Sequence, residues 1–208
     1  MNLLSELQGL SGENLCSATL RLLLIRSQDL RNSFVDLLSS KNNLGPITLG
    51  SHFSCTLEEP TVEESGNCGR LDLLLEVSDA VIGIENKLNA GFQNGQPHKY
   101  LKTVADRASG LSNLRKKLYT PIVAILAPES RKKEIEEVIG TSKSFVFLSW
   151  EVVRANLSHA AADLDAPTDV IMRALFSYVY QQTSLFPEWP SLGSRLGRWQ
   201  IPDSGRGD

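Results

Sequence analysis

Three charged side chains on two neighbouring apolar segments have the types and the spacing that metal-dependent chemistry requires. Asp72 lies in the first segment, residues 71–77, and Glu85 and Lys87 lie in the second, residues 80–88. Two carboxylates held close together repel each other unless a cation lies between them. Oxygen ligands suit Mg²⁺ or Mn²⁺ far better than Zn²⁺. An ammonium group beside such a pair can hold an anionic phosphate or orient a water molecule.

A tight turn at Ser78-Asp79 would join the two segments into a β-hairpin. In that register Asp72 lies opposite Glu85, with the two Cβ atoms ~4.5–5.5 Å apart. Lys87 shares their face because side chains alternate along a strand, and Gly83 leaves this face open to approach. The other face is wholly apolar and consists of Leu73, Leu75, Ile82 and Ile84.

A purely structural interpretation of the same residues is an ion pair beside a buried pair of strands. Asp72 and Glu85 would then pair with Arg70 or Lys87. A Glu-x-Lys tripeptide alone does not separate the two interpretations. The opposed carboxylate, the apolar character of both strands and the order of the surrounding helices together favour the metal site.

Hydrophobic periodicity predicts the elements around this hairpin. Before it we expect a helix over 13–38 with a break near Ser27, a strand over 47–57 and a loop over 58–69. After it we expect a helix from Pro97 to about Ala108, a strand over 121–126 and a helix over 131–139. A strand over 144–148 and helices over 150–157 and 166–185 complete the chain. This order predicts an α/β fold, a mixed central sheet flanked by helices.

The length and composition indicate one folded domain with a tail. The chain has 208 residues, with 41% hydrophobic and 22% charged residues, which is typical of a soluble globular protein and excludes wholesale disorder. We expect residues 1–185 to form the domain and residues 186–208, which contain Pro, Gly and isolated Trp, to form an irregular tail. The tail could dock on a protein partner or on a second copy in a homo-oligomer.

The cysteines and the apolar segments indicate the compartment. Three cysteines without metal-ligand spacing suit a reducing environment. No apolar stretch approaches the ~20 residues that a membrane-spanning helix needs. The N-terminus also lacks the basic region of a signal peptide. We therefore expect a cytoplasmic protein that is not associated with a membrane.

The net charge of −3 combines two blocks of opposite sign. Residues 51–85 contain eight acidic residues and one basic residue, whereas residues 96–133 contain nine basic and two acidic residues. A cation site beside a polyanion-binding surface would have this pattern. Solvated helix faces and loops would also have it.

The hairpin residues resemble a known family. Arg70-Leu71-Asp72 and Ile84-Glu85-Asn86-Lys87, with 12 residues between Asp72 and Glu85, resemble the core of the PD-(D/E)XK nuclease superfamily. They are most similar to its bacterial and phage branch, which carries a "GR-x-D … IENK" signature, although Leu71 stands in place of proline. The resemblance covers about residues 13–150. It implies a restriction-endonuclease-like core and magnesium-dependent cleavage of phosphodiester bonds, usually in DNA.

The resemblance also implies roles for individual residues. Asp72, Glu85 and the carbonyl of Asn86 would bind Mg²⁺, for which Mn²⁺ could substitute, and Lys87 would be the catalytic lysine. The family also has an acid on the first helix. Glu13 is our candidate for it, because it shares a helical face with Cys16, Leu20 and Leu24, and it would hold a second metal ion or its water shell. The alternatives are a favourable charge at the helix N-terminus and, as a weaker candidate for the acid, Glu6.

The family often places a Gln and then a Tyr on the helix after the lysine strand. Gln96 and Tyr100 are candidates, although Gly95 and Pro97 bias Gln96 out of the helix. Lys99, Lys102 and Arg107 are candidates for phosphate contacts. The clusters at 115–117 and 131–133 are further candidates, for which ordinary solvated charges are an equal alternative.

We therefore expect a Mg²⁺-dependent deoxyribonuclease, with an RNase that has the same site as a variant of this hypothesis. The competing hypothesis from another class is a catalytically inactive nuclease-like module that binds nucleic acid or a protein partner. The presence of Asp72, Glu85 and Lys87 argues against it, since a binding module has no chemical need for all three.

Overall fold

The computed structural model describes residues 10, 12–42, 45–61, 69–93, 95–161 and 164–183. The predictions for Glu6 and for the tail from residue 186 lie outside these residues.

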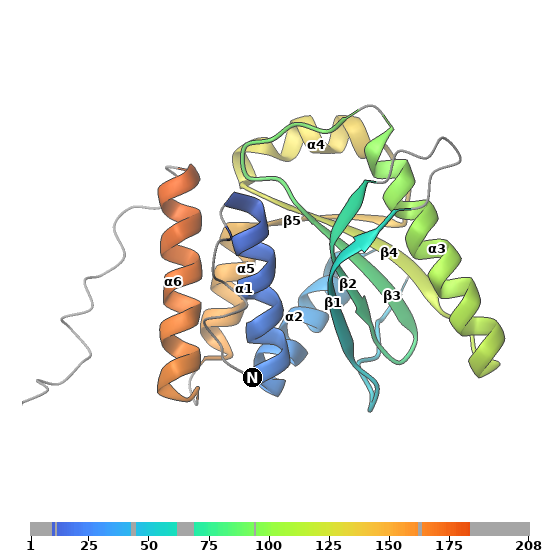
Figure 1. Cartoon of the computed structure of the whole chain (residues 1–208), viewed down its shortest axis with the longest axis horizontal. Coiled ribbons are helices and arrows are strands. Elements are labelled where there is room, and N and C mark those ends of the chain that lie inside the picture. Colours follow the sequence, from blue (N-terminus) through green and yellow to red (C-terminus); the bar gives the residue numbers. More distant parts are fainter. Residues whose placement is uncertain are drawn as a thin grey trace, which may run out of the picture.

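A mixed sheet of five strands forms the centre of the domain (Figure 1). The strands lie in the order β1-β2-β3-β4-β5. The pairs β1–β2 and β2–β3 are antiparallel, and the pairs β3–β4 and β4–β5 are parallel. The parallel strands need crossover connections, which the helices between them supply. The sheet confirms the predicted α/β class. The strand bounds are β1 (Ser54–Pro60), β2 (Arg70–Glu76), β3 (Ala80–Asn86), β4 (Thr120–Ala127) and β5 (Phe145–Ser149).

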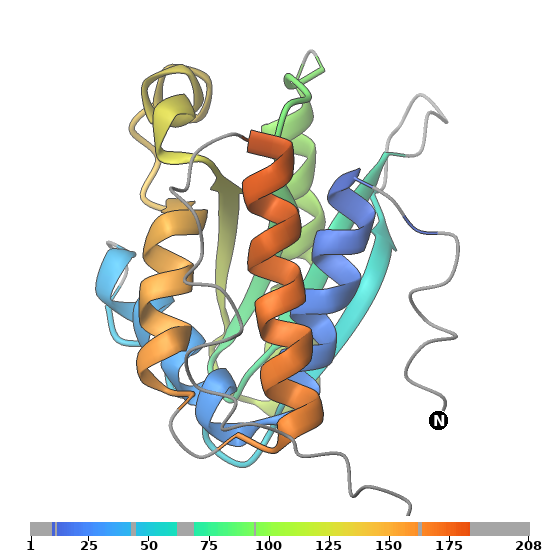
Figure 2. The same ribbon diagram turned by 90° about the vertical axis from the view of Figure 1, so that its left-hand side faces the viewer.

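Helices cover both faces of the sheet (Figures 1 and 2). One face carries α1 (Gly12–Arg26), α2 (Gln28–Lys41), α5 (Trp150–His159) and α6 (Ala166–Thr183). The other carries α3 (Gln96–Arg115) and α4 (Lys132–Ile139), which the short 3-10 helix η1 (Glu129–Arg131) precedes. None of the helices in the described part of the chain is long and apolar enough to cross a membrane.

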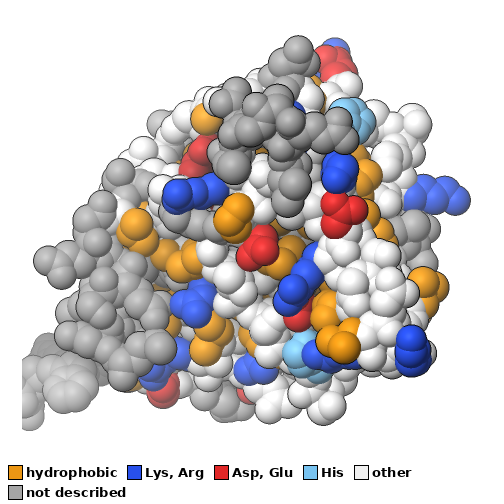
Figure 3. Space-filling model, turned by 45° about the vertical axis from the view of Figure 1, so that its right-hand side comes forward, with side chains coloured by type: hydrophobic (Ala, Val, Ile, Leu, Met, Phe, Trp, Pro, Cys, Tyr) orange, Lys and Arg blue, Asp and Glu red, His pale blue; other side chains and the backbone are white. Residues whose placement is uncertain are grey.

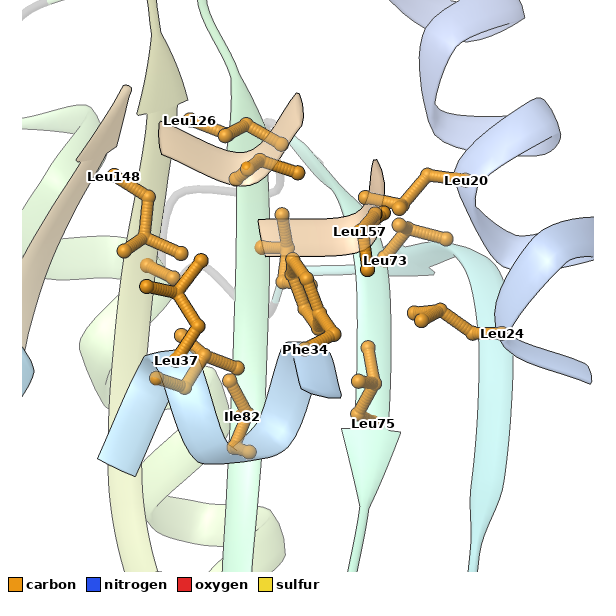
Figure 4. Close-up of a cluster of buried hydrophobic side chains, with 14 of the residues drawn as sticks. Leu20, Leu24, Phe34, Leu37, Leu73, Leu75, Ile82, Leu126, Leu148 and Leu157 are labelled. Carbon is orange, nitrogen blue, oxygen red and sulfur yellow. The ribbon is translucent and has the colours of Figure 1, made fainter. Parts of the chain in front are cut away.

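The hairpin of β2 and β3 has the predicted register. Leu73 pairs with Ile84 and Leu75 with Ile82, and the turn is closed by a hydrogen bond from the Val77 backbone N–H to the Ala80 carbonyl. The face predicted to be apolar is fully buried under α1, α2 and α5. Figure 4 shows its contacts, with Leu73, Leu75 and Ile82 surrounded by Leu20, Leu24, Phe34, Leu37 and Leu157.

Two helix boundaries can be compared with their predicted positions. The helical segment at the N-terminus breaks at Ser27, as predicted, because the Ser27 hydroxyl caps α2 by accepting from the Leu30 backbone N–H. Helix α3 runs to Arg115, seven residues beyond the predicted end at Ala108, and Leu111 in this extension is buried.

The strand predicted over 47–57 begins only at Ser54, and residues 58–60, predicted as loop, belong to β1. Residues 48 and 49 do not join the strand because they bind the turn of the β2–β3 hairpin. The Leu49 carbonyl accepts from the Ser78 backbone N–H, and Asp79 accepts from the Thr48 backbone N–H. Gly50, at φ 58°, turns the chain there.

Gly83 does not leave its face open, so this expectation was wrong. Helix α3 packs directly on it, and a Cβ atom at Gly83 would lie 2.6 Å from Leu71 Cδ2 and 2.7 Å from Val104 Cγ2. The missing side chain therefore permits close packing of α3 against the sheet, which places the start of α3 beside the end of β3.

We predict that Gly83→Ala destabilises the protein and that Gly110→Ala stabilises it. The methyl group at Gly83 overpacks a buried contact, at a cost of about 1–3 kcal/mol. Gly110 lies in α3, the helix that packs on Gly83, with nothing within 4 Å of its Cβ position, so alanine there should add about 0.5–1 kcal/mol. Urea unfolding of both variants measures the two effects. Equal stability of the two variants would contradict the packing role of Gly83.

Candidate active site

The candidate residues converge at one end of the sheet. The β2–β3 hairpin brings the start of β2, with Asp72, beside the end of β3, with Glu85. The N-terminal ends of α1 and α3 reach the same place, since Glu13 and Tyr100 both hydrogen-bond to residues at or just after the end of β3. Each helix therefore supplies its residue from a different face of the sheet.

Asp72 is held against the backbone of β3. Its Oδ2 atom accepts a hydrogen bond of 2.7 Å from the Asn86 backbone N–H. Burial, and after it the neighbouring carboxylate of Glu85, raise the pKa of Asp72 from its ordinary 3.8 to about 7, against the opposing effects of Asn86 and Lys87. The protein therefore holds Asp72 where its negative charge is unfavourable unless a cation is near.

The two carboxylate oxygens of Glu85 differ in their hydrogen bonding. Its Oε1 atom accepts from Lys87 Nζ at 2.8 Å and from the Tyr100 hydroxyl at 2.7 Å. Its buried Oε2 atom has no hydrogen-bond partner among the described residues. Burial raises the pKa of Glu85, and Lys87 is the largest opposing influence. An unpartnered buried carboxylate oxygen is costly, so Oε2 is the atom that a bound cation would satisfy.

Lys87 is as buried as its partner. The exposed fraction is 5% for Lys87 and 3% for Glu85. The Lys87 ammonium lies 5.4 Å from the centre of the Phe92 ring, which sequence reasoning missed. Phe92 follows a strand end within a short loop, and no periodic pattern distinguishes it from other loop residues.

Tyr100 and Gln96 support the site from α3. Burial and the Glu85 carboxylate raise the pKa of Tyr100, so the phenol keeps its proton and its O–H donates a hydrogen bond to Glu85. The hydrogen bond with Gln96 lowers the pKa of Tyr100. Gln96 is the first residue of α3, so the expected bias out of the helix was wrong. Gly95, at φ 73°, caps the helix, and Pro97 occupies its first turn, where proline is tolerated.

Glu13 reaches the segment that follows the lysine. Its Oε1 atom accepts a hydrogen bond of 2.7 Å from the Leu88 backbone N–H. The carboxylate is also close enough to Asp72 to raise the pKa of that residue. Cys16 and Leu20, one and two turns further along the same face of α1, are fully buried, which fixes the helix and thus Glu13.

Asn86 points the opposite way from its two neighbours. Its side-chain Nδ2 donates to the hydroxyl of Ser17 in α1, and its Oδ1 atom is buried without a partner among the described residues. Ser17 was not among the predicted site residues. Its position one turn after Glu13 on a buried helical face was the available signal.

The residues fit a hard divalent cation. The donors are two carboxylates and the Asn86 backbone carbonyl between Glu85 and Lys87, an oxygen-only set of the kind Mg²⁺ prefers. In the described ranges no group of three or more His, Cys, Asp or Glu residues is placed to hold a metal ion. Backbone carbonyl, water and substrate oxygens would therefore complete the coordination, which is usual for Mg²⁺.

The basic block does not form a continuous positive surface. Lys102 pairs with Asp106 and Arg107 with the buried Glu76. Figure 3, with the α3 side of the molecule turned forward, shows Lys and Arg side chains next to Asp and Glu side chains. Lys99 is partly buried and Lys102 is exposed, both in the half of α3 nearest the site.

Comparison with known proteins identifies the family. A family model described as the PD-(D/E)XK nuclease superfamily matches residues 16–178. The chain belongs to the PD-(D/E)XK nuclease superfamily. The match extends from α1 to α6 and confirms the resemblance inferred from the hairpin. Among solved structures, this PD-(D/E)XK protein is similar to the small subunit of the heterodimeric restriction endonuclease R.BspD6I, with 12% identity and a TM-score of 0.30 over 80% of this chain and 95% of that chain.

A search of curated proteins found no match. Membership in a nuclease superfamily implies a nucleic-acid substrate, and members typically use a divalent metal ion. The mixed sheet packed between helices is the restriction-endonuclease-like α/β fold.

We predict that Asp72→Asn melts at the same or a higher temperature than wild type in EDTA. Because the pKa of folded Asp72 is about 7 instead of 3.8, the folded state holds a proton that the unfolded chain releases in this range. Stability from this group therefore falls as the pH rises from 3.8 to about 7. The melting-temperature difference between the variant and wild type should grow through that window and then level off. Mg²⁺ or Mn²⁺ should raise the wild-type value much more than that of the variant.

Glu85→Gln is the matched control, and the structure predicts the opposite sign. This change leaves the buried Lys87 ammonium without its carboxylate, and breaking a buried ion pair costs about 3–5 kcal/mol. Glu85→Gln should therefore melt below wild type in EDTA. A markedly destabilised Asp72→Asn in EDTA, together with a wild type that does not respond to metal, would contradict the site.

Proposed function

We propose that this PD-(D/E)XK protein is a Mg²⁺-dependent nuclease that hydrolyses phosphodiester bonds of DNA, with Mn²⁺ able to replace Mg²⁺. The observation that carries the proposal is the state of Glu85. One carboxylate oxygen is fixed by Lys87 and Tyr100, and the other is buried and unpartnered beside Asp72. A cation bound between the two carboxylates would satisfy this oxygen and relieve the repulsion.

The chain's own groups have separate tasks in this proposal. Asp72, Glu85 and the Asn86 carbonyl hold the ion, and Tyr100 fixes the orientation of the Glu85 carboxylate through its 2.7 Å hydrogen bond. The bound ion would lower the pKa of a water molecule and neutralise charge on the scissile phosphate. Lys87 positions the water and donates hydrogen bonds to the charge that develops in the transition state.

Glu13 and the start of α3 complete the proposed site. Glu13 anchors the backbone after Lys87 and adds negative charge that would hold a second metal ion or its water shell. Gln96, Lys99 and Lys102 lie on the helix that supplies Tyr100, so nucleic acid bound at the site would pass along α3. The Lys102–Asp106 pair is exposed and weak enough for the lysine to exchange its partner for a phosphate.

One observation favours the competing function, a nuclease-like module that binds without catalysis. Glu85 and Lys87 are almost fully buried, and the Lys87 ammonium lies against the Phe92 ring, which leaves little surface of either charged side chain for a phosphate to contact. The raised pKa of Asp72 supports the catalytic proposal instead. A module that only binds gains nothing from a destabilising pair of buried carboxylates.

We predict that Lys87→Ala abolishes cleavage while Mg²⁺ binding stays near that of wild type. Lys87 is a cation and cannot be a metal ligand, so its loss removes positioning of the water and leaves the oxygen donors. Plasmid DNA, linear DNA and RNA incubated with and without Mg²⁺ measure activity, and the metal-dependent rise in melting temperature measures binding. Lys143→Ala, at an exposed lysine in the loop before β5, is the control that should cleave normally. Full activity of Lys87→Ala would rule out this mechanism.

Neutralising Lys99 and Lys102 together should weaken DNA binding about equally for all sequences. Each lost phosphate contact should lower the slope of log K against log salt by about one. Binding is measured on the Lys87→Ala background so that the DNA stays intact. Lys41→Gln is the matched control, because α2 lies on the opposite face of the sheet from α3. An unchanged slope for the double variant would show that Lys99 and Lys102 belong to a solvated face only.

A further inference from the structure

Arg131 lies at the end of η1, directly after β4, and its side chain turns back toward the candidate site. Its Nη1 atom donates hydrogen bonds to the backbone carbonyl of Lys87 at 3.0 Å and to that of Ala90 at 2.9 Å. Its Nε and Nη2 atoms bind the two carboxylate oxygens of Glu134 at 3.0 and 2.6 Å. The exposed fraction of the side chain is 14%.

The backbone that Arg131 holds is the part that strand pairing does not fix. Strand β3 ends at Asn86, and the chain leaves the sheet at Lys87. The Lys87 backbone N–H still donates to the Leu126 carbonyl at 2.9 Å, and the next N–H donates to Glu13. Arg131 supplies the matching donors for the carbonyl groups of this segment.

We propose that Arg131 is a positioning residue for Lys87, an inference that rests on the proposed nuclease function. With the carbonyls of Lys87 and Ala90 held by one guanidinium, the peptide after Lys87 keeps one orientation. The Lys87 ammonium then stays between Glu85 and Phe92. A planar guanidinium can serve two carbonyls and one carboxylate together, whereas a lysine ammonium cannot reproduce this fork.

The contact with Glu134 separates this role from the phosphate contact considered for the 131–133 cluster. The other two nitrogen atoms of the guanidinium, Nε and Nη2, donate to the Glu134 carboxylate, which offsets the positive charge of Arg131. A phosphate contact would lose substrate affinity and salt dependence when removed. A positioning residue would lose turnover with affinity unchanged.

The experiment compares Arg131→Ala and Arg131→Lys with Lys143→Ala, a change at an exposed lysine in the loop before β5. Cleavage of a defined linear DNA gives kcat and KM, and binding on the Lys87→Ala background gives the salt slope. We expect Arg131→Ala to lower kcat about 10–100-fold, the range found for residues that orient metal-site ligands, with KM and salt slope unchanged. Arg131→Lys should recover only part of this loss, and Lys143→Ala should behave as wild type.

Hydrogen exchange of the metal-free protein tests the contact without any activity. Exchange in residues 87–93 should be faster in Arg131→Ala than in wild type and unchanged in Lys143→Ala. If wild type cleaves neither DNA nor RNA, the proposed function fails, while the exchange result still decides whether Arg131 holds the segment. A raised KM with unchanged kcat and a lower salt slope would overturn the inference in favour of a phosphate contact. Unchanged exchange would overturn it as well, and Arg131→Lys supplies the same comparison if the alanine variant does not fold.

Discussion

The close approach of Asp72 and Glu85 across the β2–β3 hairpin is the constraint on which the candidate site depends. Both carboxylates are removed from water, which raises the pKa of each, and Glu85 makes the negative charge of Asp72 less favourable still. Proteins keep such pairs where a positive charge can come between them. Lys87 offsets part of the repulsion through Glu85 Oε1, but the second oxygen of Glu85 stays unpartnered among the described residues. Within the described residues, the fold thus keeps an unfavourable interaction at a place where a divalent cation would relieve it.

The acidic groups of the site also hold its backbone. Asp72 accepts from the Asn86 N–H and Glu13 from the Leu88 N–H, so alternate backbone donors around Lys87 end on carboxylates. These bonds tie α1 and β2 to the end of β3 and orient the lysine between them. A substitution at either acid therefore changes both the charge of the site and the path of the chain, and variants that keep the acceptor, such as Asn for Asp72, are needed to separate the two effects.

The ion pairs in the structure change the interpretation of the basic block of residues 96–133. The positive block of residues 96–133 is divided among ion pairs, with Arg107 bound to Glu76 and Arg131 to Glu134. Arg107 thereby fixes the far half of α3 to the sheet, while the near half presents Lys99 and Lys102 beside the site.

The sequence by itself determined the hairpin and its register from Leu73–Ile84 to Glu76–Val81, because a tight turn and a two-residue side-chain period leave one register that buries the apolar face. It also determined the α/β class and the family. Only the tertiary structure decided that Gly83 lies under α3, that Gln96 starts this helix and that Arg131 binds the backbone after Lys87. These contacts join residues far apart in the chain, and their geometry follows from how α3 and η1 pack on the sheet. Local periodicity predicts which face of an element is buried, but it carries no information about which distant side chain meets it there.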